Sequence, residues 1–438
     1  MVARRNWGAG LVLTLSLPLA APAVGSPTNE LELLAALPPS DGIAPKFIEA
    51  ILVRDALPQE VIVVTQNVGA DCGGGTPASA WKLTLDPNTG VLMNVVLKQH
   101  LSEIQSVRRA LLESSDGTVF AGGGWCGFKP PYVSCDGGES FRAATQGVCP
   151  PNSTFWFAEF RGTVYAGTGY HPMPGEIYRW LGAPASDWEY VTGFPWPRTI
   201  VSALAVSQDL LFAGTCAYPC SGWEGTTPVY VSADGVQFNA TLGIPSYGNV
   251  VCFAVAGSDL SACVHDCQTN AGSLYRWQAA DGLWQYQAPF DFGFMSLPAF
   301  VASGEDLYAY GQHAGDPAKG VYRSSDQGLT WQFVAAGPAL DVMTLHVHAG
   351  QLYLGTYADS ANTAYVYRLA LVAPLLGDMN CDGVVNFADI NPFVMALCWH
   401  SLYDVQFPHC NWTQADCNED GYVDFVDINA FVRLLGAP

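Results

Sequence analysis

A sequence repeat of about 47 residues recurs along most of this 438-residue chain, and it constrains the fold more than any other feature. Each copy reads as an apolar strand, a short turn, a second strand ending in small residues, a long loop, a Tyr-rich third strand and a tight turn. The second strand recurs at residues 61–65, 119–122, 164–168, 211–215, 260–263, 307–311 and 352–356. Repeats of this length are typical of units that bury their apolar faces only by stacking on one another.

Each copy has room for about four short strands, which is the size of one β-propeller blade. We therefore expect a mainly β fold, a propeller of about seven blades over residues 26–373, with the first copy the least regular. The last copy lacks a fourth strand, and residues 31–37 are the candidate that closes the ring from the N-terminal side. A β-sandwich array is the competing fold.

The turn after the third strand carries a local motif. Residues 324–331 read Ser-Ser-Asp-Gln-Gly-Leu-Thr-Trp, residues 134–141 are a close second copy, residues 232–238 are one residue short, and residues 280–284 are a remnant. In such a turn, Asp accepts backbone hydrogen bonds, Gly adopts a positive φ and the aromatic side chain packs under the hairpin. The motif resembles the Asp-box, which occurs in sialidases and in other propeller families and has a structural role.

The resemblance does not extend to sialidase chemistry. That family needs an arginine triad and a Tyr/Glu pair, and it usually has a Phe/Tyr-Arg-Ile-Pro segment near its start, which is absent here. Arginines recur at equivalent positions of the repeat, which indicates a structural role; they are Arg179, Arg276, Arg323 and Arg368.

The long second-to-third-strand loops share one rim of the predicted ring, and the Asp-box turns lie on the other. Aromatic planes with acids and histidines nearby suit a sugar or peptide ligand. The candidate ligand rim consists of Trp125, Tyr170, His171, Trp223, Glu224, His265, Asp266, His313, Asp316, Tyr357 and Asp359. Packing within the loops is the alternative role for these residues. His346 and His348 alternate on a strand, where a packing role is favoured over a metal site.

A different repeat begins after residue 374. Residues 378–389 place oxygen donors at positions 1, 3, 5, 9 and 12 of a calcium loop, with Gly at position 6 and a backbone carbonyl at position 7. The pattern returns 38 residues later, so we expect two calcium ions. The first set of ligands is Asp378, Asn380, Asp382, Val384, Asn386 and Asp389. The second set is Asp416, Asn418, Asp420, Tyr422, Asp424 and Asp427.

Both loops end in Asp, run into matching helices and lack an entering helix, so residues 374–438 resemble a type I dockerin, a small α-helical calcium-binding module. The resemblance implies a cohesin-like protein partner. Many dockerins have Ser or Thr at positions 10 and 11, whereas this chain has Phe387-Ala388 and Phe425-Val426. The partner therefore stays open, and a contact with the propeller is an alternative. Phe393 with Val394, and Phe431 with Val432, are candidate exposed anchors, whereas the alternative that we favour makes both phenylalanines the core of the module.

The first 25 residues predict a secretory signal peptide, with a basic start and an apolar stretch too short to span a bilayer. An N-terminal anchor helix is the alternative. Thirteen cysteines suit a secreted protein, with local pairs at Cys216/Cys220 and Cys263/Cys267 or a buried thiol at Cys252. A net charge of −21 disfavours nucleic acid as a partner.

Together these features predict a secreted, non-catalytic binding or scaffolding propeller tethered through its dockerin. The alternative is a polysaccharide-active glycoside hydrolase or lyase, which would need a pair of carboxylates converging on the long-loop rim.

Overall fold

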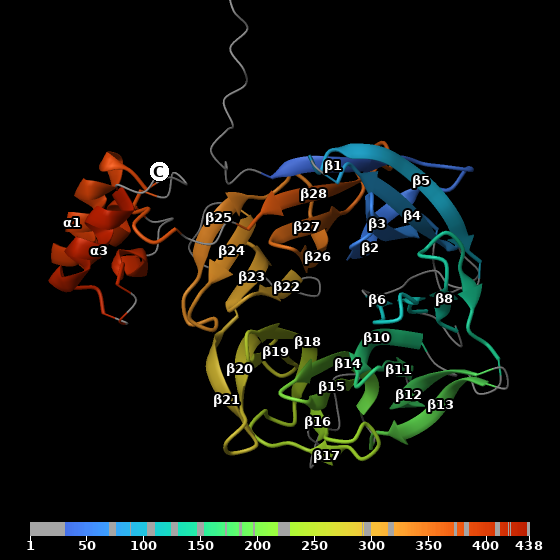
Figure 1. The fold of residues 1–438 in the computed structure, drawn as a ribbon. Coiled ribbons are helices and arrows are strands. Elements are labelled where there is room, and N and C mark those ends of the chain that lie inside the picture. The colour runs from blue at the N-terminus through green and yellow to red at the C-terminus, as the bar shows by residue number, and fades with distance from the viewer. Residues whose placement is uncertain are drawn as a thin grey trace, which may run out of the picture.

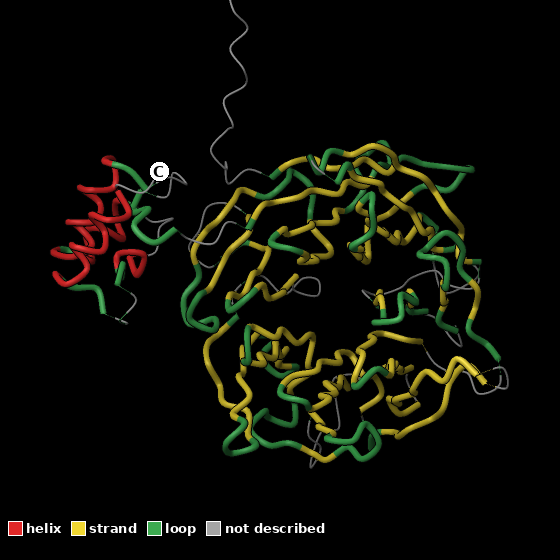
Figure 2. Tube along the Cα trace, viewed as in Figure 1, coloured by secondary structure: helices red, strands yellow, loops and turns green. Residues whose placement is uncertain are grey.

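The computed structural model describes residues 31–435 apart from residues 70–75, 88, 103–109, 124–129, 147–152, 171–172, 184–185, 196–197, 218–227, 291, 293–298, 314–318, 372–374, 381–384, 408–411, 419 and 421. The predicted signal peptide lies outside this part of the chain. The described residues are mainly β-strands, with short helices confined to the C-terminal segment. The sheets follow one another around a ring, in propeller-like fashion, and the helices lie to one side (Figures 1 and 2).

Five sheets of four antiparallel strands make up most of the ring. They are β2 (Pro45–Arg54), β3 (Gln59–Asn67), β4 (Ala78–Leu85) and β5 (Leu92–Leu101); β6 (Leu111–Glu113), β7 (Val119–Ala121), β8 (Tyr132–Ser134) and β9 (Arg142–Ala143); β18 (Gly248–Ala256), β19 (Asp259–Asp266), β20 (Gly272–Gln278) and β21 (Leu283–Pro289); β22 (Ala299–Ser303), β23 (Asp306–Gly311), β24 (Gly320–Ser324) and β25 (Gln332–Ala336); and β26 (Val342–His348), β27 (Gln351–Thr356) and β28 (Ala364–Ala370) with β1 (Glu32–Leu37).

The expectation of about seven separate blades is not met, because the rest of the ring is one eight-stranded sheet. Its strands are β10 (Ser153–Phe160), β11 (Thr163–Tyr170), β12 (Met173–Ala183), β13 (Ser186–Gly193), β14 (Arg198–Ser207), β15 (Leu210–Ala217), β16 (Val229–Ser232) and β17 (Asn239–Ala240). Two runs of four strands merge here through one pair, Gly169 with Ile200. A Cβ on Gly169 would lie 2.4 Å from the Ile200 Cα, so the absence of a side chain permits the contact.

The N-terminal strand closes the ring, as the repeat predicts. β1 pairs antiparallel with β28, and Leu37 lies opposite Ala364. A bulge between Leu33 and Ala35 shifts the register, so Leu34 and Leu37 are buried while Leu33 is 52% exposed. The first and last strands of the propeller thus share one sheet, which leaves no open edge at the seam.

The small residues at the end of each second strand bring neighbouring sheets together. A Cβ added to Gly214 would lie 2.5 Å from the Val250 side chain, and one added to Gly355 would lie 2.5 Å from Ile48. In each case the close neighbour belongs to the first strand of the next sheet. The glycine is therefore required for the close approach that stacks one sheet on the next.

The Asp-box-like turns form the predicted hydrogen bonds. Asp326 accepts from the Thr330 backbone N–H at 2.9 Å and from the Ser324 hydroxyl at 2.7 Å, and the turn continues through Gly328 at φ +89°. The same bonds recur around Asp136. Trp331 packs edge-on against Phe290, which follows β21 of the preceding sheet, so the hydrogen bonds of the turn are local whereas its aromatic side chain contacts the neighbouring sheet.

The recurring arginines also have the structural role expected of them. Each makes an ion pair within its own sheet: Arg179 with Glu189, Arg276 with Asp259, Arg323 with Asp306, and Arg368 with Glu32.

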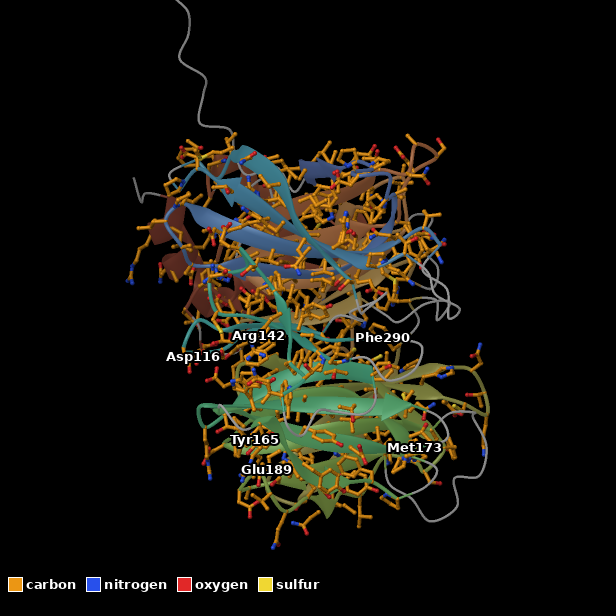
Figure 3. All side chains as sticks on the ribbon, turned by 90° about the vertical axis from the view of Figure 1, so that its right-hand side faces the viewer. Asp116, Arg142, Tyr165, Met173, Glu189 and Phe290 are labelled. Carbon is orange, nitrogen blue, oxygen red and sulfur yellow. The ribbon has the colours of Figure 1, made fainter. Side chains whose placement is uncertain are left out.

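Figure 3 shows the ring from the side. Asp116, in a first-to-second-strand turn, and Met173, which follows a second-to-third-strand loop, lie near opposite rims. The two kinds of connection therefore lie on different rims.

The C-terminal segment folds as a cluster of short helices around two stacked phenylalanines. Its α-helices are α1 (Ile390–Cys398), α2 (His400–Gln406) and α3 (Ile428–Leu435), and its 3-10 helices are η1 (Phe387–Asp389), η2 (Trp412–Ala415) and η3 (Phe425–Asp427). Phe393 and Phe431 are 2% and 3% exposed, and their rings stack with centroids 3.9 Å apart. The core role favoured for the two phenylalanines is confirmed, and the exposed-anchor alternative is wrong for them, while Val394 and Val432 are exposed.

The cysteines differ in part from the sequence-based prediction. Cys216 and Cys263 do not form the two predicted local disulfides, Cys267 is disulfide-bonded, and Cys252 is the buried thiol that the alternative allowed for. Cys216 donates to the Val250 carbonyl, and Cys263 is fully buried in β19. The register of β18 and β19 sets Cys252 beside Cys263 and points both side chains into the core.

Among the described helices, none is long and apolar enough to cross a membrane.

Candidate functional site

The first calcium-loop candidate is organised around a buried carboxylate. Asp389 is fully buried, and its side chain accepts hydrogen bonds from the backbone N–H groups of Met379 at 2.8 Å, Asn380 at 3.0 Å and Asn386 at 2.8 Å. Asn386 caps the short helix η1, which places Asp389 at the end of the loop. Asp382 and Val384 lie outside the described residues.

The second loop candidate repeats this arrangement. Asp427 is also fully buried, and it accepts from the Asn418 N–H at 3.1 Å and the Asp424 N–H at 2.9 Å. Asp424 caps η3 as Asn386 caps η1. Within the same loop, Asp420 N–H donates to the Asp416 side chain at 3.1 Å. The described parts of the two loops therefore share the buried terminal carboxylate and the capped 3-10 helix.

The donor set of both loops suits a hard cation. Neither Asp389 nor Asp427 makes an ion pair with a Lys, Arg or His among the described residues, and buried charge without a counter-charge is costly. Calcium takes carboxylate, amide and carbonyl oxygens. Over the described ranges, no three His, Cys, Asp or Glu side chains form a metal-holding group, and a loop of this pattern would take part of its ligands from Asn side chains and backbone carbonyls.

Both loops also present apolar side chains to solvent. Phe387 is 79% exposed in the first loop, and Phe425 and Val426 are 69% and 64% exposed in the second. On the helices that follow, Val394 and Val432 are 43% and 57% exposed, each next in sequence to a buried phenylalanine. Two similar apolar faces therefore surround the stacked core of the module.

The predicted ligand rim is only partly within the described residues. Trp125, His171, Trp223, Glu224 and Asp316 fall outside them, as does the side chain of Tyr170. Of the rest, His265 bonds to Asn270 at 2.9 Å, His313 packs against Phe292, and Tyr357 packs against Phe47 of the next sheet.

The two described rim carboxylates serve their own turns. Burial tends to raise the pKa of Asp266, but the backbone N–H groups of Thr269 and Gln268 outweigh it and lower the pKa. The Thr363 N–H and the Tyr365 hydroxyl likewise lower the pKa of Asp359. Both groups are therefore held as hydrogen-bond acceptors rather than as a converging acid and base.

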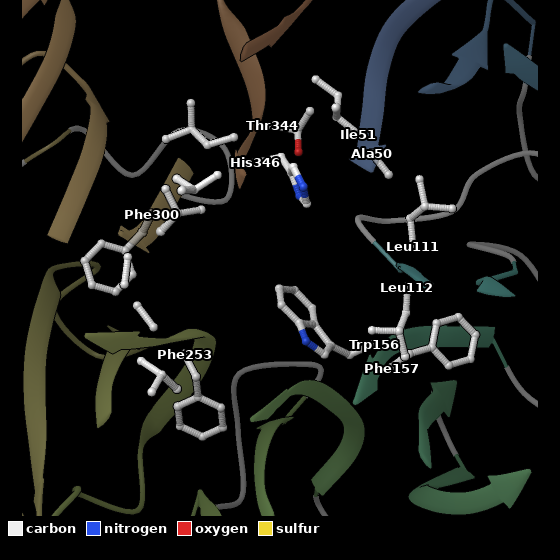
Figure 4. A pocket seen from close by; sticks show the side chains of 16 residues that line it. Ala50, Ile51, Leu111, Leu112, Trp156, Phe157, Phe253, Phe300, Thr344 and His346 are labelled. Carbon is white, nitrogen blue, oxygen red and sulfur yellow. The ribbon is translucent and has the colours of Figure 1, made fainter. Parts of the chain in front are cut away.

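A central cavity, which the sequence did not reveal, lies where the first strands of the sheets meet. It has a volume of about 350 Å³ and is lined by β2, β6, β10, β18, β22 and β26, mostly with apolar side chains. Figure 4 shows the Trp156 indole and the His346 imidazole extending into this space from different strands. Most side chains around the cavity are therefore apolar, and Trp156, His346 and Thr344 add an aromatic plane and three hydrogen-bonding groups.

His346 is held by a hydrogen bond from the neighbouring sheet. The Val53 backbone N–H donates to His346 Nε2 at 3.4 Å, across 293 positions of sequence. Burial, with His348 nearby, lowers the pKa of His346 to about 4. At neutral pH the imidazole is therefore uncharged.

A polar mouth opens from the chamber at His346 and Val347, which line both spaces. The mouth has a volume of about 520 Å³ and also includes Asp55, Glu113 and Glu159. His348 Nε2 lies 2.8 Å from the Asp55 carboxylate. Arg54 forms ion pairs with Glu113 at 2.8 Å and with Glu60. Three carboxylates, of Asp55, Glu113 and Glu159, line the mouth together with this one arginine, so acidic groups outnumber arginines there.

Sequence reasoning missed Trp156 entirely. It pairs in register with Gly167, and the equivalent positions in other first strands hold Ala50, Ala203, Cys252 and Thr344. A tryptophan where the other copies have small residues was the available signal.

Comparisons with known proteins name no family for this chain. No family model matches the chain, and no curated protein matches it. Among solved structures, the computationally designed Ika8 protein is 14% identical with a TM-score of 0.45, and covers 77% of this chain and 100% of that chain. The WD40 β-propeller domain of Doa1 is 12% identical with a TM-score of 0.46, and covers 77% of this chain and 96% of that domain.

Proposed function

We propose that this chain is a secreted binding or scaffolding protein with two modules. The propeller presents a ligand surface, with the long-loop rim as the candidate site for a carbohydrate. The C-terminal module is a dockerin-like unit that takes two calcium ions and attaches the chain to a cohesin-like partner. In this proposal the eight-stranded sheet counts as two merged blades, which gives seven in all, and the Asp-box-like turns are its family signature.

The observation that carries the proposal is the pair of buried carboxylates, Asp389 and Asp427. Each is fully buried without a cationic partner among the described residues. Each is fixed by backbone N–H groups from the same two places of its loop. Equivalent charges held in this way favour a bound cation, because a cation would offset the cost of their burial.

The partner face follows from the exposed residues. Phe387 and Ala388 occupy the positions where many dockerins have hydroxyl side chains, as do Phe425 and Val426 in the second loop. Because these faces are apolar and exposed, the matching partner surface is apolar too. Because they are duplicated, the partner can bind in either of two orientations related by a pseudo-twofold axis.

Calcium binding is the direct test. Calorimetric titration of the full chain should give two ions bound, and chelation should abolish a separate low-temperature unfolding transition while the propeller transition persists. The double variant Asp389→Asn with Asp427→Asn should lose both ions. Asp281→Asn, in an Asp-containing turn of the propeller, is the matched control and should retain them. Absence of binding at millimolar calcium, with the chain folded, would refute the calcium role.

Docking is tested separately with a cohesin module on a surface. Changing Phe387 and Ala388 to Ser should leave affinity nearly intact, and so should changing Phe425 and Val426 to Ser, whereas changing all four should abolish binding. Complete loss from either single-face variant, with calcium occupancy preserved, rules out the two-orientation arrangement. A glycan array with the same protein tests the carbohydrate surface.

A further inference from the structure

The central chamber contains one polar group whose hydrogen-bonding state the structure fixes. A backbone N–H can only donate, so His346 Nε2, which receives the Val53 N–H, must be the unprotonated nitrogen. In the neutral ring the proton is then on Nδ1. No described group accepts a hydrogen bond from His346 Nδ1, and the ring is partly exposed to the chamber. The chamber therefore offers His346 Nδ1–H as a donor, and the Trp156 indole N–H and the Thr344 hydroxyl also lie among its lining groups.

The walls around this donor are apolar and aromatic. Trp156 is only partly buried, and Phe253 and Phe300 line the chamber from β18 and β22. A volume of about 350 Å³ lies within the range of ligand sites, roughly 300–1,000 Å³. Mainly apolar side chains with a few directional polar groups, here His346, Thr344 and the Trp156 indole N–H, are the usual composition of a site for a small molecule.

We propose that the central chamber binds a small, flat, uncharged and largely apolar molecule that bears one hydrogen-bond-accepting oxygen. The oxygen accepts from His346 Nδ1, and the flat part lies against the Trp156 indole. This site is distinct from the long-loop rim and from the calcium loops, so it adds a second binding activity to the proposed function.

Charge selects against ionic ligands. At the polar mouth an anion would meet the carboxylates of Asp55, Glu113 and Glu159. A cation would leave water for a chamber that holds no carboxylate among its lining residues. A neutral molecule incurs neither cost, and it gains from burying its apolar surface against the walls.

Equilibrium dialysis with 2-naphthol tests the site, with naphthalene as the same ring system without the oxygen. The full chain should bind one 2-naphthol saturably below millimolar concentration, and naphthalene more weakly. His346→Phe should lower 2-naphthol affinity roughly tenfold, the size of one hydrogen bond, and leave naphthalene affinity within about twofold. His348→Phe, at the mouth, is the matched control and should change neither.

The location of binding is tested by filling the chamber. Ala302 lines it from β22 and is partly exposed, so Ala302→Phe should abolish binding of both probes while the melting temperature of the propeller holds. Unchanged binding in a folded Ala302→Phe protein would place the probes elsewhere and overturn the proposal. So would an absence of saturable 2-naphthol binding, or an equal loss of both probes in His346→Phe.

Discussion

Replacement of Leu37 by Ala tests whether the N-terminal strand holds the propeller together. Leu37 is fully buried, with 0% of its side chain exposed to solvent. Its hydrophobic cluster includes Val61 and Leu83 of the first sheet and Val366 of the last. Truncating a buried Leu to Ala typically costs 2–5 kcal/mol, and the two-sided packing here places the expected loss at about 3 kcal/mol. For a domain of this size, that corresponds to a melting temperature lower by roughly 4 °C.

Leu33→Ala is the matched control in the same strand. Leu33 is 52% exposed because the bulge turns it outward, so its truncation should cost no more than about 0.5 kcal/mol. The assay is urea unfolding of both variants, followed by intrinsic fluorescence, together with calorimetry. Equal destabilisation by the two substitutions, or a Leu37→Ala protein as stable as the parent, would show that β1 does not close the core.

Two further predictions concern the C-terminal module and the propeller turns. Phe431→Ala should destabilise the module by about 3–5 kcal/mol, since it removes half of the stacked core, whereas Val432→Ala, 57% exposed, should be nearly neutral in the same calorimetric experiment. The Ser140 hydroxyl and N–H hold the pKa of Asp136 at about 2, below its ordinary value of 3.8, so the stability it supplies is present above pH 4 and is lost as the pH falls through 2. Asp136→Asn should therefore reduce the fall in the urea midpoint between pH 5 and pH 2, and an identical fall in both proteins would contradict this role.

Local chemistry was predictable because its determinants lie a few residues apart. The hydrogen bonds of Asp326 join groups within four positions of it, so the turn motif alone specifies them. The same holds for Asp389 and Asn386, whose mutual cap spans three positions. Repeat spacing located the strands for a related reason, since each antiparallel pair of strands is joined by a short connection.

Contacts between distant segments were not predictable in the same way. The two local cysteine pairs were wrong because the direction of each thiol depends on strand register and not on spacing. The count of separate sheets was wrong because one contact, Gly169 with Ile200, merges two runs of strands. The exposure of Leu33 depends on a bulge that the alternation of apolar residues does not reveal.

The sequence by itself determined the repeating four-stranded units, the strand that closes the ring, the hydrogen-bonded turns and the two matched loops, because each depends on the order of residues within a short stretch. Only the tertiary structure decided what lies at the centre of the ring. The tautomer of His346 is fixed by a hydrogen bond from Val53, 293 positions away. The chamber that Trp156 reaches is lined by six strands that are far apart in sequence. The chamber is a property of the closed ring, since the walls that make it apolar meet only when the first and last strands have paired.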